Sequence, residues 1–173
     1  MLNVNLFAGP GAGKSTTAAE LFYHLKQDDK KVEYIQEYAK DLTYSAEQVR
    51  LRDQVHVLGE QHHRLVRLEG QVDIAIHDSP FIMGLAYADY NKVPKESFTT
   101  FVRDLFMSYN NLNILLERSP YHPYKPYGRS QSASEALQKD QEIKGMLDEL
   151  QIPYTVVVVN EDTVETILRM ING

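Results

Sequence analysis

A glycine-rich turn close to the amino end of the sequence has the residue types and spacing of a phosphate-binding site. The turn reads Ala8-Gly9-Pro10-Gly11-Ala12-Gly13-Lys14-Ser15-Thr16. Glycines allow successive backbone N–H groups to curl around an anion, and the positive end of a following helix attracts the same charge. Lys14 would reach the β- and γ-phosphates of a nucleoside triphosphate, and the Ser15 hydroxyl would hold Mg²⁺. The pattern predicts that nucleotide is bound by Gly9, Gly11, Ala12, Gly13, Lys14, Ser15 and Thr16.

The glycine-rich turn (residues 8–16) departs from the usual spacing at one place. A glycine is usual five residues before Gly13, and Ala8 stands there instead. Alanine is compatible with the turn as long as its backbone is not left-handed, a conformation that favours glycine. The alternative is a chance glycine-rich turn. It is disfavoured because residues 2–7 read as a strand and residues 17–25 as a helix, the context that such a turn requires.

Two acidic residues follow later apolar segments. Glu37 comes directly after residues 32–36, and Asp78 comes directly after residues 72–77. Open α/β sheets place ligand-binding residues where strands end. An aspartate at the end of an apolar strand can hold Mg²⁺ directly or through water, so Ser15 and Asp78 are the predicted metal ligands. The alternative for Asp78 is that it caps the next helix.

A polar segment at about residues 118–133 has the composition of a functional loop. Residues 121–131 of this segment contain three tyrosines, two prolines and the cations Lys125 and Arg129, and the prolines disfavour a helix. Long loops in compact domains are commonly functional. We expect a lid that excludes water and brings Arg118 and Arg129 to the transferred phosphoryl group. The alternative is a rigid surface loop.

Residues 45–67 have the pattern of one long amphipathic helix. Ser45 and Gln48 have the form of a capping box, which predicts that the helix begins at Ser45. An apolar stripe is expected to be buried; it consists of Leu51, Val55, Leu58 and Leu65. Because a helix turns by about 100° per residue, a second, mostly polar stripe lies beside the apolar one. It either lines a pocket or is a solvent-exposed flank of the helix. This stripe consists of Arg50, Gln54, Val57, Gln61 and Arg64.

Strands and helices must alternate along the chain to bring these residues together. The expected strands are residues 2–7, 32–36, 72–77, 112–116 and 153–159, and the last is apolar enough to be buried on both faces. A helix is expected to begin at Pro94, with Phe98, Phe101, Val102, Leu105 and Phe106 facing the core. Two further helices are expected after the capping box of Ser132 and Glu135 and after Asp162.

Composition limits the class of protein. The 173 residues suit a single domain, and the absence of cysteine excludes disulfides and thiolate metal sites. The net charge of −6 disfavours a broad surface for duplex DNA. We see no room for a signal peptide and no apolar run of membrane-spanning length. We therefore expect one domain over residues 1–173 that is cytoplasmic and has no membrane partner.

These motifs together resemble the P-loop nucleoside and nucleotide kinase family. Within it, the chain is similar to small kinase-like proteins described as ATPases in bacteriophages and to the ribosylnicotinamide kinases. The shared features are Glu37-Tyr38, the helix with two glutamines and Asp78-Ser79-Pro80. The resemblance implies a three-layer α/β fold with a five-stranded parallel sheet of order 2-3-1-4-5, helices on both faces and a lid loop. It also implies ATP and Mg²⁺, and the host cytoplasm for a phage-encoded protein.

The resemblance also implies roles for the acceptor side. In deoxynucleoside kinases a glutamate after the second strand accepts the proton of the sugar hydroxyl, which would be Glu37, with Asp78 as the other candidate base. A glutamine of the following helix reads the base, which would be Gln54 or Gln61, and Tyr38 accompanies Glu37. The segment after the last strand packs on adenine, which would be residues 160–163, beginning with Asn160. The arginine that follows the strand-three acid in these kinases is missing; its place would be taken by Arg50, Arg64 or Arg118.

The sequence thus predicts a kinase that transfers the γ-phosphoryl group of ATP to a hydroxyl or phosphate of a nucleoside-type acceptor. A free nucleoside, a nucleoside monophosphate and a hydroxymethylated pyrimidine in phage DNA stay open as acceptors. The alternative class is a nucleotide-binding accessory ATPase without an acceptor. A guanine switch is disfavoured because Asn91-Lys92-Val93-Pro94 lacks the aspartate of the guanine-binding motif.

Overall fold

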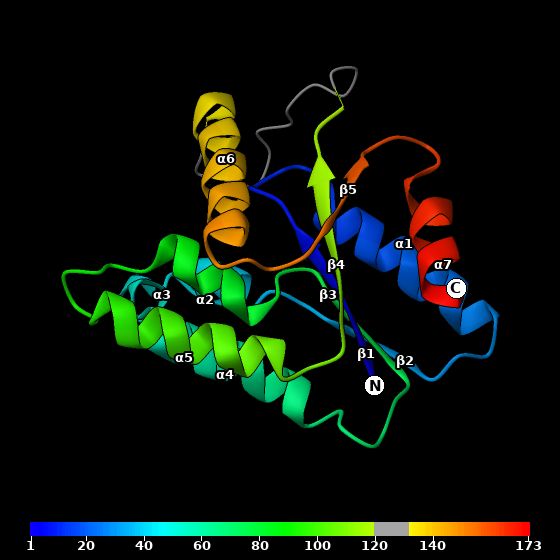
Figure 1. Cartoon of the computed structure of the whole chain (residues 1–173), viewed down its shortest axis with the longest axis horizontal. Helices are drawn as coiled ribbons and strands as arrows, with labels where there is room; N and C mark the ends of the chain where they lie inside the picture. Colours follow the sequence, from blue (N-terminus) through cyan, green and yellow to red (C-terminus); the bar gives the residue numbers. More distant parts are fainter. Residues whose placement is uncertain (120–131) are drawn as a thin grey trace.

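The computed structural model of the chain describes residues 1–119 and 132–173, and its strands form one parallel sheet (Figure 1). The strand order is β2-β3-β1-β4-β5 across five strands, which confirms the predicted order 2-3-1-4-5. The strands are β1 (Leu2–Phe7), β2 (Val32–Ile35), β3 (Ile74–His77), β4 (Asn111–Glu117) and β5 (Thr155–Val158).

The parallel register places the ends of neighbouring strands at one edge of the sheet. Ile35 of β2 lies opposite His77 of β3, and β3 in turn pairs with β1. Each of these strands is therefore followed, at the same edge, by a residue of interest. These residues are Ala8 after β1, Glu37 shortly after β2 and Asp78 after β3.

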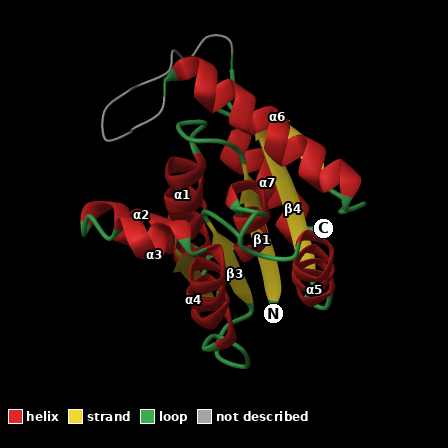
Figure 2. Cartoon of the chain, turned by 90° about the vertical axis from the view of Figure 1, so that its left-hand side faces the viewer, coloured by secondary structure: helices red, strands yellow, loops and turns green. Residues whose placement is uncertain are grey.

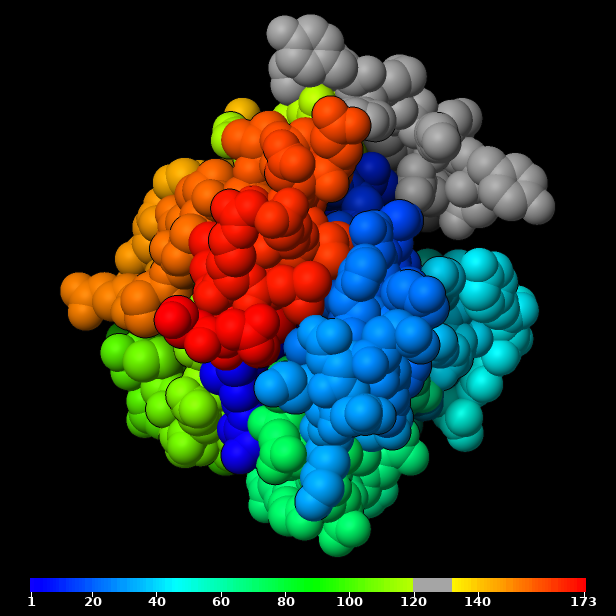
Figure 3. Space-filling view, turned by 90° about the vertical axis from the view of Figure 1, so that its right-hand side faces the viewer, coloured from blue at the N-terminus to red at the C-terminus, as the bar shows by residue number. Residues whose placement is uncertain are grey.

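Helices cover both faces of the sheet. One face carries α1 (Lys14–Gln27) and α7 (Thr163–Asn172), which lie side by side in Figure 3. The opposite face carries α4 (Gln54–Val66), α5 (Lys95–Met107), α6 (Ala133–Glu149) and the 3₁₀ helix η1 (Phe81–Tyr87), with α4, α5 and α6 toward the viewer in Figure 2. The capping box of Ser132 and Glu135 is confirmed at the start of α6.

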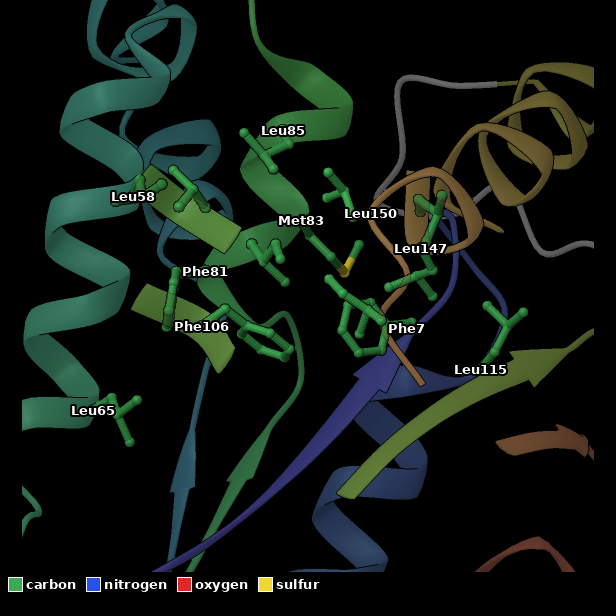
Figure 4. Packing of buried hydrophobic residues seen from close by; sticks show 14 of the residues in the cluster. Phe7, Leu58, Leu65, Phe81, Met83, Leu85, Phe106, Leu115, Leu147 and Leu150 are labelled. Carbon is green, nitrogen blue, oxygen red and sulfur yellow. The ribbon is translucent and has the colours of Figure 1, made fainter. Parts of the chain in front are cut away.

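Aromatic residues pack the core beneath η1 (Figure 4). Phe106 of α5 meets Phe7 of β1 edge-on, with ring centroids 6.2 Å apart, and meets Phe81 of η1 at 5.6 Å. Such edge-to-face pairs stabilise by more than their buried area alone. They fix η1 to the sheet directly after Asp78, so the chain leaves β3 in a defined direction.

A row of polar side chains crosses the same face of the sheet on β4, β1 and β3. The Asn5 amide nitrogen donates to the side-chain oxygens of Asn113 at 2.9 Å and of Asn111 at 3.0 Å. His77 Nε2 lies 3.2 Å from Asn3 Oδ1, and burial lowers the pKa of the His77 ring to about 3. These bonds satisfy most of the buried polar groups between the central strands, whereas His77 Nδ1 has no hydrogen-bond partner among the described residues.

The single long helix predicted from Ser45 is wrong. Ser45 is the C-cap of α2 (Tyr38–Tyr44), and the short helix α3 (Gln48–Arg52) lies between α2 and α4. Asp53 caps the start of α4, where its side chain accepts from the His56 amide. Ala46 takes a left-handed backbone, φ 56°, and the Glu47 amide closes the turn onto the Leu42 carbonyl at 2.9 Å. These backbone bonds prevail over the capping-box pattern and reset the helical phase. Val55 is therefore 50% exposed instead of buried.

The prediction that the last strand is buried on both faces is also wrong. β5 is an edge strand beside β4, and its Val157 packs toward α7, whereas Val156 and Val158 are 47% and 44% exposed. An apolar sequence does not distinguish a central strand from an edge strand. Similarly, Phe101 of α5 is exposed, although the helix was predicted to bury it.

Candidate functional site

The glycine-rich turn joins β1 to α1. Gly11 and Gly13 have positive φ angles of 78° and 100°, which explains glycine at these two places. Among the described residues outside glycine, only Asp29, Ala46 and Gln151 have a positive φ. Ala8 is not left-handed, so the condition under which alanine is compatible with the turn is met.

The two polar side chains that follow the turn point to different partners. Lys14 Nζ donates to the carbonyl oxygens of Ala8 at 2.8 Å and Gly9 at 3.2 Å, so the ammonium group lies over the turn. The Ser15 hydroxyl donates to Asp78 Oδ2 at 2.7 Å. The structure thus brings together Ser15 and Asp78, the two predicted metal ligands, and places the Lys14 ammonium group at the turn that is predicted to bind phosphates.

Asp78 is 2% exposed, and its two carboxylate oxygens differ in their hydrogen bonds. Its Oδ2 also accepts from the Tyr34 hydroxyl at 3.1 Å, and burial, followed by the charge of Asp78, raises the pKa of Tyr34. Its Oδ1 is buried and has no hydrogen-bond partner among the residues that the structure describes. An unsatisfied carboxylate oxygen beside a hydroxyl is a donor set that fits Mg²⁺, which prefers oxygen ligands and usually takes one or two from protein.

No denser metal centre is present in the described part of the chain. Residues 1–119 and 132–173 contain no cluster of three or more His, Cys, Asp or Glu side chains able to hold an ion. A metal at Ser15 and Asp78 would therefore complete its coordination with phosphate oxygens and water, as is usual for Mg²⁺ bound with a nucleotide.

Glu37 lies between the glycine-rich turn and α2. It is the N-cap residue of α2 and has an extended backbone, with φ −66° and ψ 118°. Burial raises the pKa of its carboxyl; the positive charge of Lys14 opposes the rise, and the negative charge of Asp78 adds to it. A carboxyl in this environment takes up a proton more readily than an exposed glutamate, which is the property of a general base working near neutral pH.

Asp78 is not part of the lining, but one cleft connects Lys14, Ser15 and Glu37. It has a volume of about 730 Å³ and runs from the glycine-rich turn past Glu37 to a second region formed by α2, α3, α4 and η1. Its lining includes residues that the sequence analysis did not single out, namely Lys40, Arg52, Met83, Gly84 and Tyr87. The cleft thus has one end suited to phosphates and another with apolar and polar side chains, joined at Glu37.

The predicted polar stripe divides into residues that line the cleft and residues that do not. Gln54, Val57 and Gln61 line it. Arg50 lies outside: its side chain is 61% exposed and pairs with Glu47 at 2.7 Å. The break between α3 and α4 is the reason, because it removes the common helical phase on which the stripe was predicted.

Tyr38 and Arg64 form a cluster beside the cleft instead of lining it. The Tyr38 hydroxyl bonds His56 Nε2 at 3.0 Å, and the Arg64 guanidinium lies 5.1 Å from the centre of the Tyr38 ring. Arg64 also pairs with Asp41 at 2.5 Å and donates to the Gln36 carbonyl at 3.2 Å. Both side chains therefore stabilise the start of α2, close to Glu37.

Arg118 contacts the glycine-rich turn from the end of β4. It donates to the Pro10 carbonyl at 2.6 Å and forms an ion pair with Asp140 of α6. Asp140 Oδ1 also accepts from the Gly9 amide at 2.6 Å. No sequence pattern indicates a role for Asp140, which lies 131 positions from Gly9. Arg129, the other predicted lid arginine, lies outside the described residues.

Asn160 begins the turn after β5. Its side chain accepts from the Asp162 amide at 2.9 Å, and its own amide donates to Thr163 Oγ1 at 2.7 Å. The preceding Val159 side chain lies 3.6 Å from where a Cβ on Gly13 would stand. This segment therefore adjoins the glycine-rich turn, although Asn160 does not line the cleft.

Comparison with known proteins places the chain in context. A family model described as an AAA domain matches residues 3–165. No curated protein matches the chain significantly.

No helix among the described residues is both long and apolar enough to cross a membrane.

Solved structures of deoxyadenosine kinase from M. mycoides share the fold along the whole chain. The structure with bound dATP has 20% sequence identity and a TM-score of 0.59, with 100% of both chains covered. The structure with bound dCTP has 17% identity and a TM-score of 0.57, with 98% of each chain covered. A third, with the products dCMP and a flexible dCDP, has 17% identity and a TM-score of 0.55, with 99% of each chain covered.

Proposed function

We propose that this chain, which belongs to the AAA domain family, is a kinase that transfers the γ-phosphoryl group of ATP to a hydroxyl of a nucleoside-type acceptor. The observation that carries the proposal is the single cleft in which Glu37 stands between the glycine-rich turn and a second binding region. The shared fold of deoxyadenosine kinases that bind dATP and dCTP supports a nucleoside or nucleotide as the acceptor.

The donor nucleotide would bind at the glycine-rich turn. Backbone amides of the turn and the start of α1 would hold the phosphates, and Lys14 would exchange its two carbonyl partners for phosphate oxygens. A bound Mg²⁺ neutralises phosphate charge, and Ser15 and Asp78 are the residues that would hold it. Arg118 supports this end by holding the Pro10 carbonyl. Asn160 and the residues after it would adjoin the adenine.

Glu37 is the group best placed to act as the base. An acceptor hydroxyl in the second region would pass its proton to the Glu37 carboxylate while its oxygen bonds to the γ-phosphorus and the bond to ADP breaks. Asp78 is less suited, because its Oδ2 already accepts from Ser15 and Tyr34. Gln54 and Tyr87, which line the second region, would contact the acceptor. Transfer of this kind depends mainly on positioning and electrostatics.

An ADP-release assay tests the proposal. The protein is incubated with ATP, Mg²⁺ and, separately, nucleosides, nucleoside monophosphates and a duplex that carries hydroxymethylpyrimidine. We expect ADP release to depend on one class of acceptor, and Glu37→Gln to reduce it about 10²–10⁴-fold. ADP release that is independent of every acceptor would instead indicate an ATPase and would refute the kinase.

A further inference from the structure

We propose that Gln61 is a positioning residue that fixes Glu37, and that it does not read the acceptor. The inference rests on the proposed function, because it assigns Gln61 to the residue proposed as the base. By resemblance to deoxynucleoside kinases, Gln61 would be a candidate to read the base of the acceptor; the proposal gives it a different role.

The Gln61 side chain holds the backbone on both sides of Glu37. Its Oε1 accepts from the Tyr38 amide at 2.8 Å, and its Nε2 donates to the Gln36 carbonyl at 3.2 Å. The two bonds span the peptide groups that flank Glu37. One amide side chain thus fixes both the direction in which the chain enters Glu37 and the direction in which it leaves.

These bonds leave Gln61 little capacity to recognise a ligand. The side-chain oxygen can accept two hydrogen bonds and the NH₂ group can donate two, and the backbone beside Glu37 already uses one of each, on the edge of the amide that carries both groups. Gln61 is 4% exposed, although it lines the cleft. To turn that edge toward a base, Gln61 would have to release the Tyr38 amide and the Gln36 carbonyl, and buried groups left without partners are costly.

The helix that carries Gln61 is a rigid support. Leu58 and Leu65 of α4 are 6% and 1% exposed within the core. Arg64, on the same helix, adds a second donor to the Gln36 carbonyl at 3.2 Å. Glu37 is therefore tied to a packed helix, although it lies outside any regular element. Such support matters because a misplacement of about 1 Å can lower a rate roughly 10²-fold.

Gln54 provides a matched comparison on the same helix. It also lines the cleft, but its Nε2 donates to the nearby Leu51 carbonyl at 2.8 Å and has no link to the residues around Glu37. Its Oε1 faces Gly84 of η1, 3.3 Å from where a Cβ on that glycine would stand. Gln54 is thus the glutamine that remains available to the acceptor.

Kinetics of Gln61→Met and Gln54→Met separate positioning from recognition. We expect Gln61→Met to lower kcat about 10–100-fold with an acceptor KM within about threefold of the wild type, because the base is displaced. Gln54→Met should raise the acceptor KM about tenfold or more. A Gln61→Met protein with unchanged kcat and a raised acceptor KM would overturn the inference.

Hydrogen exchange of the Tyr38 amide gives a second readout that needs no activity. We expect Gln61→Met to speed exchange of this amide at least tenfold, and Gln54→Met to leave it unchanged. Gln61→Glu retains an acceptor for the Tyr38 amide but loses the donor to Gln36. It should restore the slow exchange and, through its added charge, move the acidic limb of the rate profile to higher pH. Slow exchange in Gln61→Met would refute the contact.

These readouts keep the two proposals distinguishable. A wild-type protein that transfers phosphate to no acceptor would refute the proposed function, and the exchange rates of the Tyr38 amide would still test its contact with Gln61. A wild-type kinase whose Gln61→Met variant keeps its full kcat and its slow exchange would refute only the role of Gln61. Gln61→Glu serves for the exchange measurement if Gln61→Met does not fold.

Discussion

Replacing Gly9 with alanine should damage the glycine-rich turn through a contact with α6. A Cβ on Gly9 would stand 2.7 Å from Asp140 Oδ1 and 2.8 Å from the Ala136 carbonyl oxygen. Gly9 is not among the glycines with positive φ, so the backbone of the turn tolerates alanine. The effect of the substitution would therefore come from the clash alone.

The loss of stability expected for Gly9→Ala depends on which atoms of α6 must move to make room for the added Cβ. The Asp140 side chain can rotate away, but it would then give up its bonds to the Gly9 amide and Arg118. The Ala136 carbonyl belongs to the backbone of α6, which is held by Ile143 and Leu147 in the core. Overpacking of this kind costs about 1–3 kcal/mol. A change of 1 kcal/mol lowers Tm by about 2–4 °C in a chain of this size.

Gly145→Ala is the matched control, because this glycine lies in α6 with no atom within 4 Å of the added Cβ. Alanine is favoured over glycine inside a helix by about 1 kcal/mol, so this variant should be slightly more stable than the wild type.

Thermal unfolding with and without ATP and Mg²⁺ measures both expected effects. Gly9→Ala should unfold about 2–12 °C below the wild type without ligand. It should also lose part of the ligand-induced stabilisation, which is about 2.7 kcal/mol at a concentration 100 times Kd and falls by about 1.4 kcal/mol for a tenfold weaker Kd. Gly9→Ala that matches the wild type in both measurements would refute the close approach of α6 to the turn.

Other predictions concern single side chains at or near the site. Lys14→Met should abolish the ATP-induced rise in Tm while it lowers the unliganded stability by about 1–3 kcal/mol, since it removes two hydrogen bonds to carbonyls; retained protection would contradict the phosphate role. Asp78→Asn should remove the dependence of nucleotide protection on Mg²⁺, measured by the same assay with and without EDTA. In the pH profile of kcat/KM, the acidic limb should have its midpoint above pH 4.5, the ordinary pKa of a glutamate, because burial raises the pKa of Glu37 and the reaction requires its ionised form. A midpoint at or below pH 4.5 would count against Glu37 as the base. The free energy of unfolding should fall as the pH drops below 6.5, by up to about 1.4 kcal/mol per pH unit. The reason is that His77 becomes protonated there in the unfolded chain, whereas the folded ring has a pKa of about 3. An NMR titration of the folded protein in which His77 titrates near pH 6.5 would contradict this.

The sequence determined the features that contiguous residues encode. The glycine-rich turn, the strand before it and the helix after it could be read from one stretch, because backbone conformation there depends on glycines and on local apolar spacing. The same is true of the capping box at Ser132 and of Asp78 after an apolar strand. These elements alternate along the chain, which favours parallel strands joined by helices. The strand order came from resemblance, and the structure confirms it.

Which side chains from distant parts of the sequence meet depends on how the elements pack. Asp140 reaches Gly9 over 131 positions, and Gln61 reaches Tyr38 over 23, through bonds that no local pattern specifies. The break at Ala46 and the exposure of Val156 on β5 likewise depend on packing partners and on position in the sheet. The physical reason is that short-range sequence patterns fix backbone conformation and polarity, whereas burial and long-range hydrogen bonds are settled only when the elements pack together.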